Sequence, residues 1–171
     1  MTDGTARYAY EDGTWFIKLA GDLRHPLGPA LNALLDRAFA GPDDSRFVID
    51  LAAAENIDST CLGILARIAN RTMPPGGPRP AIITGGGDIA ELLLAVCFDR
   101  LFDLVDSADG AQGPLQPAPV IAIGRDEMLT LLLDAHRRLC GIDARTHAVF
   151  RDVVEALEAA NALGQHGAML S

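Results

Sequence analysis

The feature that most constrains this chain is a buried strand followed by a loop and an amphipathic helix. The run Phe47-Val48-Ile49-Asp50-Leu51 is apolar and contains neither Gly nor Pro, which is typical of a central strand in a parallel sheet. After the loop the spacing of apolar residues changes and predicts a helix over 60–71. The residues on its apolar face are Leu62, Leu65, Ile68 and Ala69.

Two hydroxyl residues lie where this helix is expected to begin. Asp58 or Ser59 is the predicted N-cap, because either side chain can accept a hydrogen bond from a free backbone N–H. Ser59 and Thr60 therefore form a candidate switch site beside an acidic residue. Because Asp, Ser and Thr cap ordinary helices, their spacing alone favours a capping role over a regulatory one.

Composition excludes several classes of function. The formal net charge is −9 across 171 residues, with no basic run, which argues against binding nucleic acid. Cys61, Cys97 and Cys140 lie far apart, so we expect reduced thiols, no metal site and no cofactor. The polar N-terminus and the absence of a long apolar run predict a cytoplasmic protein without membrane insertion.

The first hundred residues alternate between strand and helix patterns. Asp12-Gly13 lies between two β-rich runs and predicts a hairpin that closes at Gly21-Asp22-Leu23. The repeated helix-then-strand order after it predicts a mixed α/β sheet with helices packed on it and a right-handed parallel crossover. The predicted strands are 7–10, 14–19, 46–51 and 81–84, and the predicted helices are 30–38, 60–71 and 89–96.

The chain changes character after Ser107. Residues 108–119 are rich in Pro and Gly and predict a linker. Residues 120–171 predict a C-terminal α-helical hairpin, with Gly141 and Asp143 between its helices. Its apolar stripes are Met128, Leu132, Ala135 and Leu139, then Phe150, Val153, Leu157 and Ala160. These stripes must dock on the domain 1–107 or form a homodimer, and the sequence leaves both open.

Residues 7–107 resemble the STAS domain, the fold of anti-sigma factor antagonists. Four landmarks carry the resemblance in the expected order. They are Gly21-Asp22-Leu23, the strand Phe47–Leu51, the run Ile57-Asp58-Ser59-Thr60-Cys61-Leu62-Gly63, which is similar to the family's Asp-Ser-Ser-Gly-Leu-Gly signature, and Cys97-Phe98-Asp99-Arg100-Leu101-Phe102. The resemblance implies an α/β fold and a protein that is not an enzyme.

The resemblance also implies phosphorylation-controlled partner switching. A serine kinase that doubles as the anti-sigma factor phosphorylates the serine after the signature Asp, which is Ser59 here, with Thr60 as the alternative. A metal-dependent serine phosphatase reverses the reaction. The residues expected to contact the partner are Asp22, Asp58, Ser59, Thr60, Cys61 and Leu62.

One residue departs from the signature. Cys61 stands where the family usually has glycine, the residue that allows a kinase close to the backbone. A thiol in the first turn of a helix can have a lowered pKa, which adds a redox interpretation. The competing interpretation is a small apolar filler.

Other features suggest rival functions. Gly85-Gly86-Gly87 before a helix suggests a phosphate cradle, but the run lacks the Lys-Ser/Thr of a P-loop and the GxGxxG spacing, which favours a strand-to-helix turn capped by Asp88. Asp22, Asp50 and Asp58 could meet at the strand ends as a metal site, and the four histidines are scattered. The main alternative to partner switching is a constitutive, non-phosphorylated STAS scaffold or transporter-associated module.

Overall fold

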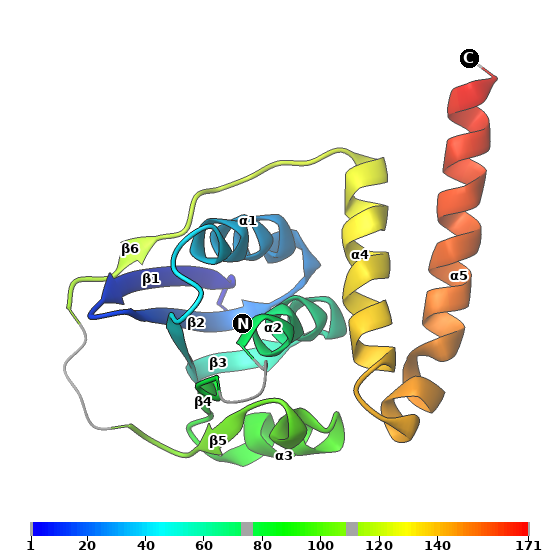
Figure 1. Ribbon diagram of the computed structural model, residues 1–171. Helices are drawn as coiled ribbons and strands as arrows, with labels where there is room; N and C mark the ends of the chain where they lie inside the picture. The colour runs from blue at the N-terminus through cyan, green and yellow to red at the C-terminus, as the bar shows by residue number, and fades with distance from the viewer. Residues whose placement is uncertain (1, 73–76, 109–112, 171) are drawn as a thin grey trace.

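The computed structural model describes residues 2–72, 77–108 and 113–170, and its centre is a mixed six-stranded sheet (Figure 1). The strand order is β5-β4-β3-β2-β1-β6. The strands are β1 (Thr5–Glu11), β2 (Thr14–Leu23), β3 (Arg46–Ile57), β4 (Ala81–Ile83), β5 (Asp103–Val105) and β6 (Gln116–Pro117). The helices are α1 (Gly28–Phe39), α2 (Ser59–Thr72), α3 (Gly87–Ala95), α4 (Arg125–Cys140) and α5 (Ala144–Met169), with short 3₁₀ helices η1 (His25–Leu27) and η2 (Phe98–Arg100).

The predicted hairpin and crossover are confirmed. Strands β1 and β2 pair antiparallel around Asp12-Gly13, while β2, β3, β4 and β5 pair in parallel. The α/β class and the mixed sheet are therefore as the sequence predicts. Part of the predicted loop after α2, residues 73–76, lies outside the described residues.

The antiparallel pairing of the hairpin ends at Thr5 and Ala20, directly before Gly21-Asp22-Leu23 as predicted, but strands β2 and β3 are longer than predicted. The parallel pairing continues to Leu23 and Ile57, past two register shifts in β2. Gly21 has φ +80°, and a Cβ there would lie 2.5 Å from the carbonyl oxygen of Asp3. Glycine is needed because the N-terminal segment crosses directly over this backbone. The consequence is that β2 and β3 end side by side, just before α2.

The three glycines before α3 form a turn. Gly85, Gly86 and Gly87 all have positive φ, and Gly86 is the N-cap. The prediction that Asp88 caps this helix is wrong, because Asp88 lies inside the first turn and no side chain caps α3. Because the turn of positive-φ glycines leads directly into the helix, α3 begins at Gly87, one residue before Asp88.

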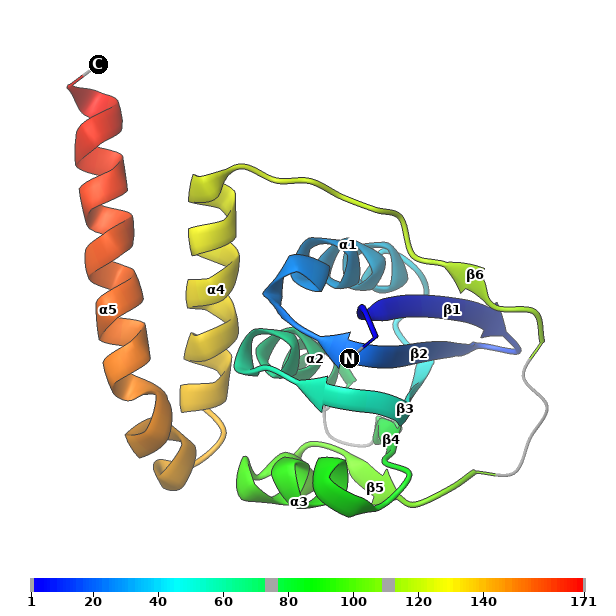
Figure 2. The same cartoon turned by 180° about the vertical axis from the view of Figure 1, so that it is seen from behind.

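The predicted linker contains a short strand. Gln116 and Pro117 pair with Tyr8 and Arg7 at the edge of the sheet, where Pro is tolerated. Residues 109–112, which include the predicted Asp109-Gly110 turn, lie outside the described residues. The linker therefore follows the sheet edge before it reaches α4 (Figures 1 and 2).

Two C-terminal helices form the predicted hairpin. Gly141 ends α4, and Asp143 starts α5 in a capping box in which its side chain accepts from the amides of Arg145 and Thr146. Helix α4 lies between α2 and α5 in both views (Figures 1 and 2). The hairpin thus docks on its own chain through α4; the homodimer remains a prediction.

Candidate functional site

The candidate site begins with Asp58, which fixes the start of α2. Its Oδ1 accepts a hydrogen bond from the amide of Cys61 at 2.9 Å, so Asp58 is the N-cap. Its Oδ2 accepts from the amide of His25 at 2.6 Å, and its own amide donates to the carbonyl of Leu23. The carboxylate of Asp58 therefore joins η1 to the first turn of α2, and its amide joins both to the end of β2.

Ser59 is the first residue of α2, and its hydroxyl contacts the C-terminal hairpin. The Oγ of Ser59 lies 2.8 Å from Nε2 of His136 in α4. The Nδ1 of His136 lies 2.7 Å from the carbonyl oxygen of Leu132. Because a carbonyl oxygen can only accept, Nδ1 donates to Leu132, and in the neutral tautomer of that arrangement Nε2 accepts from Ser59. His136 is only 5% exposed, so this bond is formed away from solvent.

The backbones of α2 and α4 touch one turn further along. A Cβ on Gly63 would lie 2.2 Å from the carbonyl oxygen of Ala135, and the next two nearest atoms also belong to Ala135. The side chain of Leu131 approaches Gly28 at the start of α1 in the same way. The last glycine of the signature run is therefore a point where the backbones of the sheet domain and the hairpin lie close together.

A second set of contacts holds the turn of the hairpin. Arg145 donates to Sγ of Cys97 at 2.9 Å, and Arg100 lies 3.4 Å from Asp143. The amide of Thr146 lowers the pKa of Asp143. The side chains of Arg100 and Arg145 are mostly exposed, and exposed ion pairs contribute little stability. The main attachment of the hairpin is therefore the face that α4 shares with α2.

Comparison with known proteins gives one informative likeness. No protein-family model matches the chain, and no curated protein matches it. A solved structure, an anti-sigma factor antagonist from Mycobacterium paratuberculosis, aligns with a TM-score of 0.52 at 23% identity, covering 61% of this chain and 87% of that chain. The chain has the STAS fold. The fold expected from the four landmarks is thus confirmed.

Three of the predicted contact residues are buried in this STAS domain. Thr60 is 3% exposed, Cys61 is fully buried and Leu62 is nearly so. Burial raises the pKa of the Cys61 thiol, and the neighbouring Asp58 raises it further. The redox interpretation of Cys61 is therefore wrong, because a reactive cysteine needs a lowered pKa and access to solvent.

The acidic residues at the strand ends have separate partners. Asp22 accepts from the side chains of Arg24 and Asn56, whereas Asp50 lies 3.9 Å from Lys18. Among the described residues, no three Asp, Glu, His or Cys side chains are grouped to hold a metal ion. The rival metal site at Asp22, Asp50 and Asp58 is therefore not assembled.

The contact between Ser59 and His136 has the geometry of a nucleophile and its base. Catalysis also needs a substrate cavity beside the reacting atom. The cavities at Trp15, Arg24, Arg46 and Asp126 do not include either residue in their lining. What the described residues show directly is that the pair joins α2 to α4.

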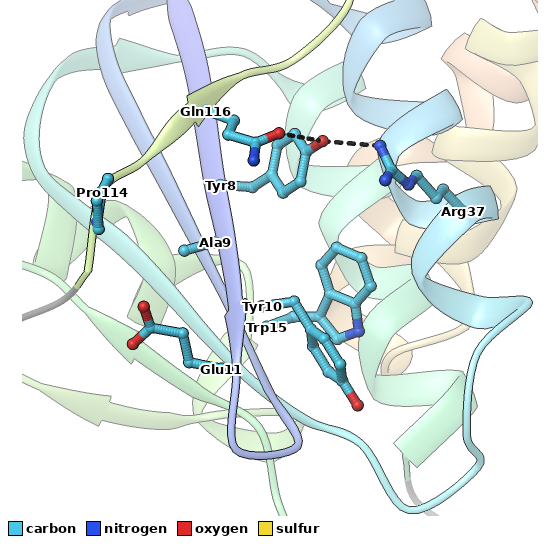
Figure 3. A pocket seen from close by; sticks show the side chains of 8 residues that line it. All are labelled: Tyr8, Ala9, Tyr10, Glu11, Trp15, Arg37, Pro114 and Gln116. Atoms are coloured by element: carbon cyan, nitrogen blue, oxygen red, sulfur yellow. Dashed lines mark hydrogen bonds between the residues drawn. The ribbon is translucent and has the colours of Figure 1, made fainter.

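One of these cavities, of about 550 Å³, lies at the other end of the sheet (Figure 3). It adjoins the β1–β2 turn, whereas Ser59 follows the opposite ends of β2 and β3. The hydroxyl of Tyr8 accepts from Arg37 at 2.7 Å and donates to Gln116 at 3.3 Å. These bonds join β1 to α1 on one side and to the edge strand β6 on the other.

His136 is the site residue that the sequence did not predict. It is separated from Ser59 by 77 positions, so no local motif joins them. The one available signal is its phase on α4: His136 follows Leu132 by four residues and is adjacent to Ala135, within the predicted apolar stripe.

Replacing Asp58 with alanine is expected to lower the free energy of unfolding by about 1–2 kcal/mol, because α2 loses its N-cap. Urea denaturation of the full chain measures the change. The matched control is Asp88→Ala, since Asp88 lies in the first turn of α3 without capping it, and its effect should stay within about 0.5 kcal/mol. Equal losses in the two variants would contradict the role of Asp58.

Proposed function

We propose that this chain is an anti-sigma factor antagonist that switches protein partners through phosphorylation of Ser59. Its partner would be a serine kinase that doubles as the anti-sigma factor, and a metal-dependent phosphatase would restore the hydroxyl. The proposal is supported by the STAS fold, which the antagonist from Mycobacterium paratuberculosis shares, and by the position of Ser59 in the signature run. It implies a cytoplasmic phosphoprotein that regulates transcription through protein contacts.

The observation that carries the proposal is the division of roles between Asp58 and Ser59. Asp58 supplies the N-cap, so the hydroxyl of Ser59 is not used by the helix. Ser59 is part-buried, whereas Thr60 is 3% exposed. A kinase needs a hydroxyl that is free of the backbone and near the surface, which favours Ser59 over Thr60 as acceptor.

A phosphate on Ser59 would act on the partner more than on the fold. It adds a charge of roughly −1.5 to −2 at the start of α2, where the helix dipole and the first N–H groups tolerate an anion. Asp58 beside it already makes the local potential negative. The main effect is therefore repulsion and desolvation at a partner surface packed against this loop.

The test combines site mapping with one charged variant. Phosphopeptide mapping of the protein from its native cell should find a phosphate on Ser59 that phosphatase removes. In pull-downs from the same cell, Ser59→Asp is expected to recover the kinase at roughly a tenth of the wild-type level or less, consistent with the cost of an unpaired interface charge. Ser107→Asp is the matched control, because Ser107 is an exposed hydroxyl outside the site. Equal recovery with both variants would refute the switch.

A constitutive STAS scaffold is the second candidate. The observation in its favour is that the Ser59 hydroxyl is already bonded to His136. The same mapping separates the two functions, because a scaffold would carry no phosphate under any growth condition.

Within the described residues, no helix is both long and apolar enough to cross a bilayer.

A further inference from the structure

We propose that the α4–α5 hairpin is an internal competitor of the protein partner. It occupies the surface around Ser59 and Gly63 that any protein reading the state of Ser59 must contact. This inference rests on the proposed function, since it assigns a second occupant to the same surface.

The first argument is the bond made by Ser59. The Oγ points at Nε2 of His136, 2.8 Å away, and the ring is held in turn by the carbonyl of Leu132. A phosphoryl donor approaching Oγ, or a partner side chain that binds the hydroxyl, must take the place of this ring. The kinase and the partner therefore both require His136 to move.

The second argument is the closeness of the helices. The backbone of Ala135 lies against Gly63, with no room for even a methyl group between them. A partner element cannot enter between α2 and α4 while they remain in this contact. Access to this face of α2 is thus governed by whether the hairpin is docked or lifted.

The third argument is that the hairpin can move as a unit. Ala135 and Leu139 in α4 belong to the core cluster, whereas α5 packs on α4 and leaves Val149, Leu163 and Met169 well exposed. The linker that precedes α4 is paired with the edge of the sheet through the two residues of β6. Lifting the hairpin therefore needs the loss of the α2–α4 contact and of the exposed contacts made by Arg100 and Arg145, but it does not need the sheet to open.

Competition sets the apparent affinity of the partner. When only a fraction of molecules has the hairpin lifted, the observed dissociation constant is the intrinsic one divided by that fraction. A substitution that lifts the hairpin without altering the partner surface should therefore tighten partner binding and expose Ser59 together.

Gly63→Ala tests whether the contact between α2 and α4 keeps the hairpin docked. The three atoms nearest to the added Cβ all belong to the backbone of Ala135, so the change acts on the hairpin, and alanine is a better helix former than glycine within α2. The matched control is Gly164→Ala in α5, where the nearest atom is a side-chain oxygen of Asp126 at 3.5 Å. His136→Ala is a second variant that removes the bond to Ser59 and leaves α2 unchanged.

Hairpin opening can be measured without any partner. In full-length protein carrying Ser59→Cys, the labelling rate of the thiol at position 59 is followed by fragment-ion mapping, which separates it from Cys61. Gly63→Ala is expected to raise this rate by roughly tenfold or more, because it destabilises the docked state while the imidazole of His136 is retained. Gly164→Ala should leave the rate unchanged. An unchanged rate in Gly63→Ala would overturn the proposal.

Partner affinity supplies the second readout, with serine retained at position 59. His136→Ala changes only the hairpin side of the contact, so it should raise recovery of the kinase by roughly tenfold, comparable to the rise in labelling caused by Gly63→Ala. Faster labelling with unchanged recovery would overturn the competition, because the hairpin would then lie outside the partner surface. If no kinase or phosphate is found, the proposed function fails, while the labelling still reports whether the hairpin covers Ser59.

Discussion

Replacing Phe98 with alanine is expected to lower the free energy of unfolding by about 3–5 kcal/mol. Phe98 is fully buried in the core and stacks on Phe102, with 5.4 Å between ring centroids. The small side chain would leave a cavity that the surrounding close-packed residues can only partly fill. Since domains of this size are commonly stable by about 5–15 kcal/mol, this one change removes a large share.

Leu94→Ala is the matched control for Phe98→Ala. Leu94, in α3, precedes Phe98 by four positions but is 51% exposed, so its loss should change the free energy of unfolding by about 0.5 kcal/mol or less. Urea denaturation at one pH compares the two variants. A loss in Phe98→Ala no greater than in Leu94→Ala would mean that the landmark Cys97–Phe102 does not anchor the core.

The elements that the sequence predicted are those whose signals are local. The strand at 47–51 and the helix after it follow from short apolar periodicities, and Asp12-Gly13 identifies the hairpin turn. The ends of β2 and β3 were predicted too early, because their continuation depends on pairing with each other. Parallel pairing joins distant segments and leaves no mark within either strand.

The site was only half predictable for the same reason. The pattern predicted one apolar face on α2, yet Gly63 and Ile64 are buried as well, because the sheet covers one side of the helix and α4 covers the other. The sequence did predict that the stripe containing Ala135 must dock on some surface. It could not predict that this surface includes Ser59, since His136 comes from the far end of the chain.

Cys61 lies in the signature run and is also part of the buried packing beneath α2. Glycine is usual at its position, but the structure places a fully buried thiol there, which donates to the carbonyl of Arg24 at 3.4 Å. Its environment keeps the thiol neutral, so Cys61 serves as a small apolar side chain beneath the first turn of α2. Its ionisation therefore gives a direct test of how well that turn is sealed.

The stability of the wild type relative to Cys61→Ala is expected to fall by about 1.4 kcal/mol per pH unit above pH ~8.5. Because burial raises the pKa of Cys61 in the folded state, the thiol stays protonated there while the unfolded chain releases its proton. The stabilisation is therefore complete below the unfolded pKa and is lost as pH rises towards the folded one. Urea denaturation of both proteins between pH 7 and about 10 measures the difference.

Cys140→Ala is the control for this pH dependence. Burial also raises the pKa of Cys140, but that side chain is only partly covered, so its pH dependence should be shallower than that of Cys61. Parallel stability profiles for the wild type and Cys61→Ala would show that the thiol ionises in the folded protein. The description of Cys61 as a buried side chain beneath the first turn of α2 would then have to be abandoned.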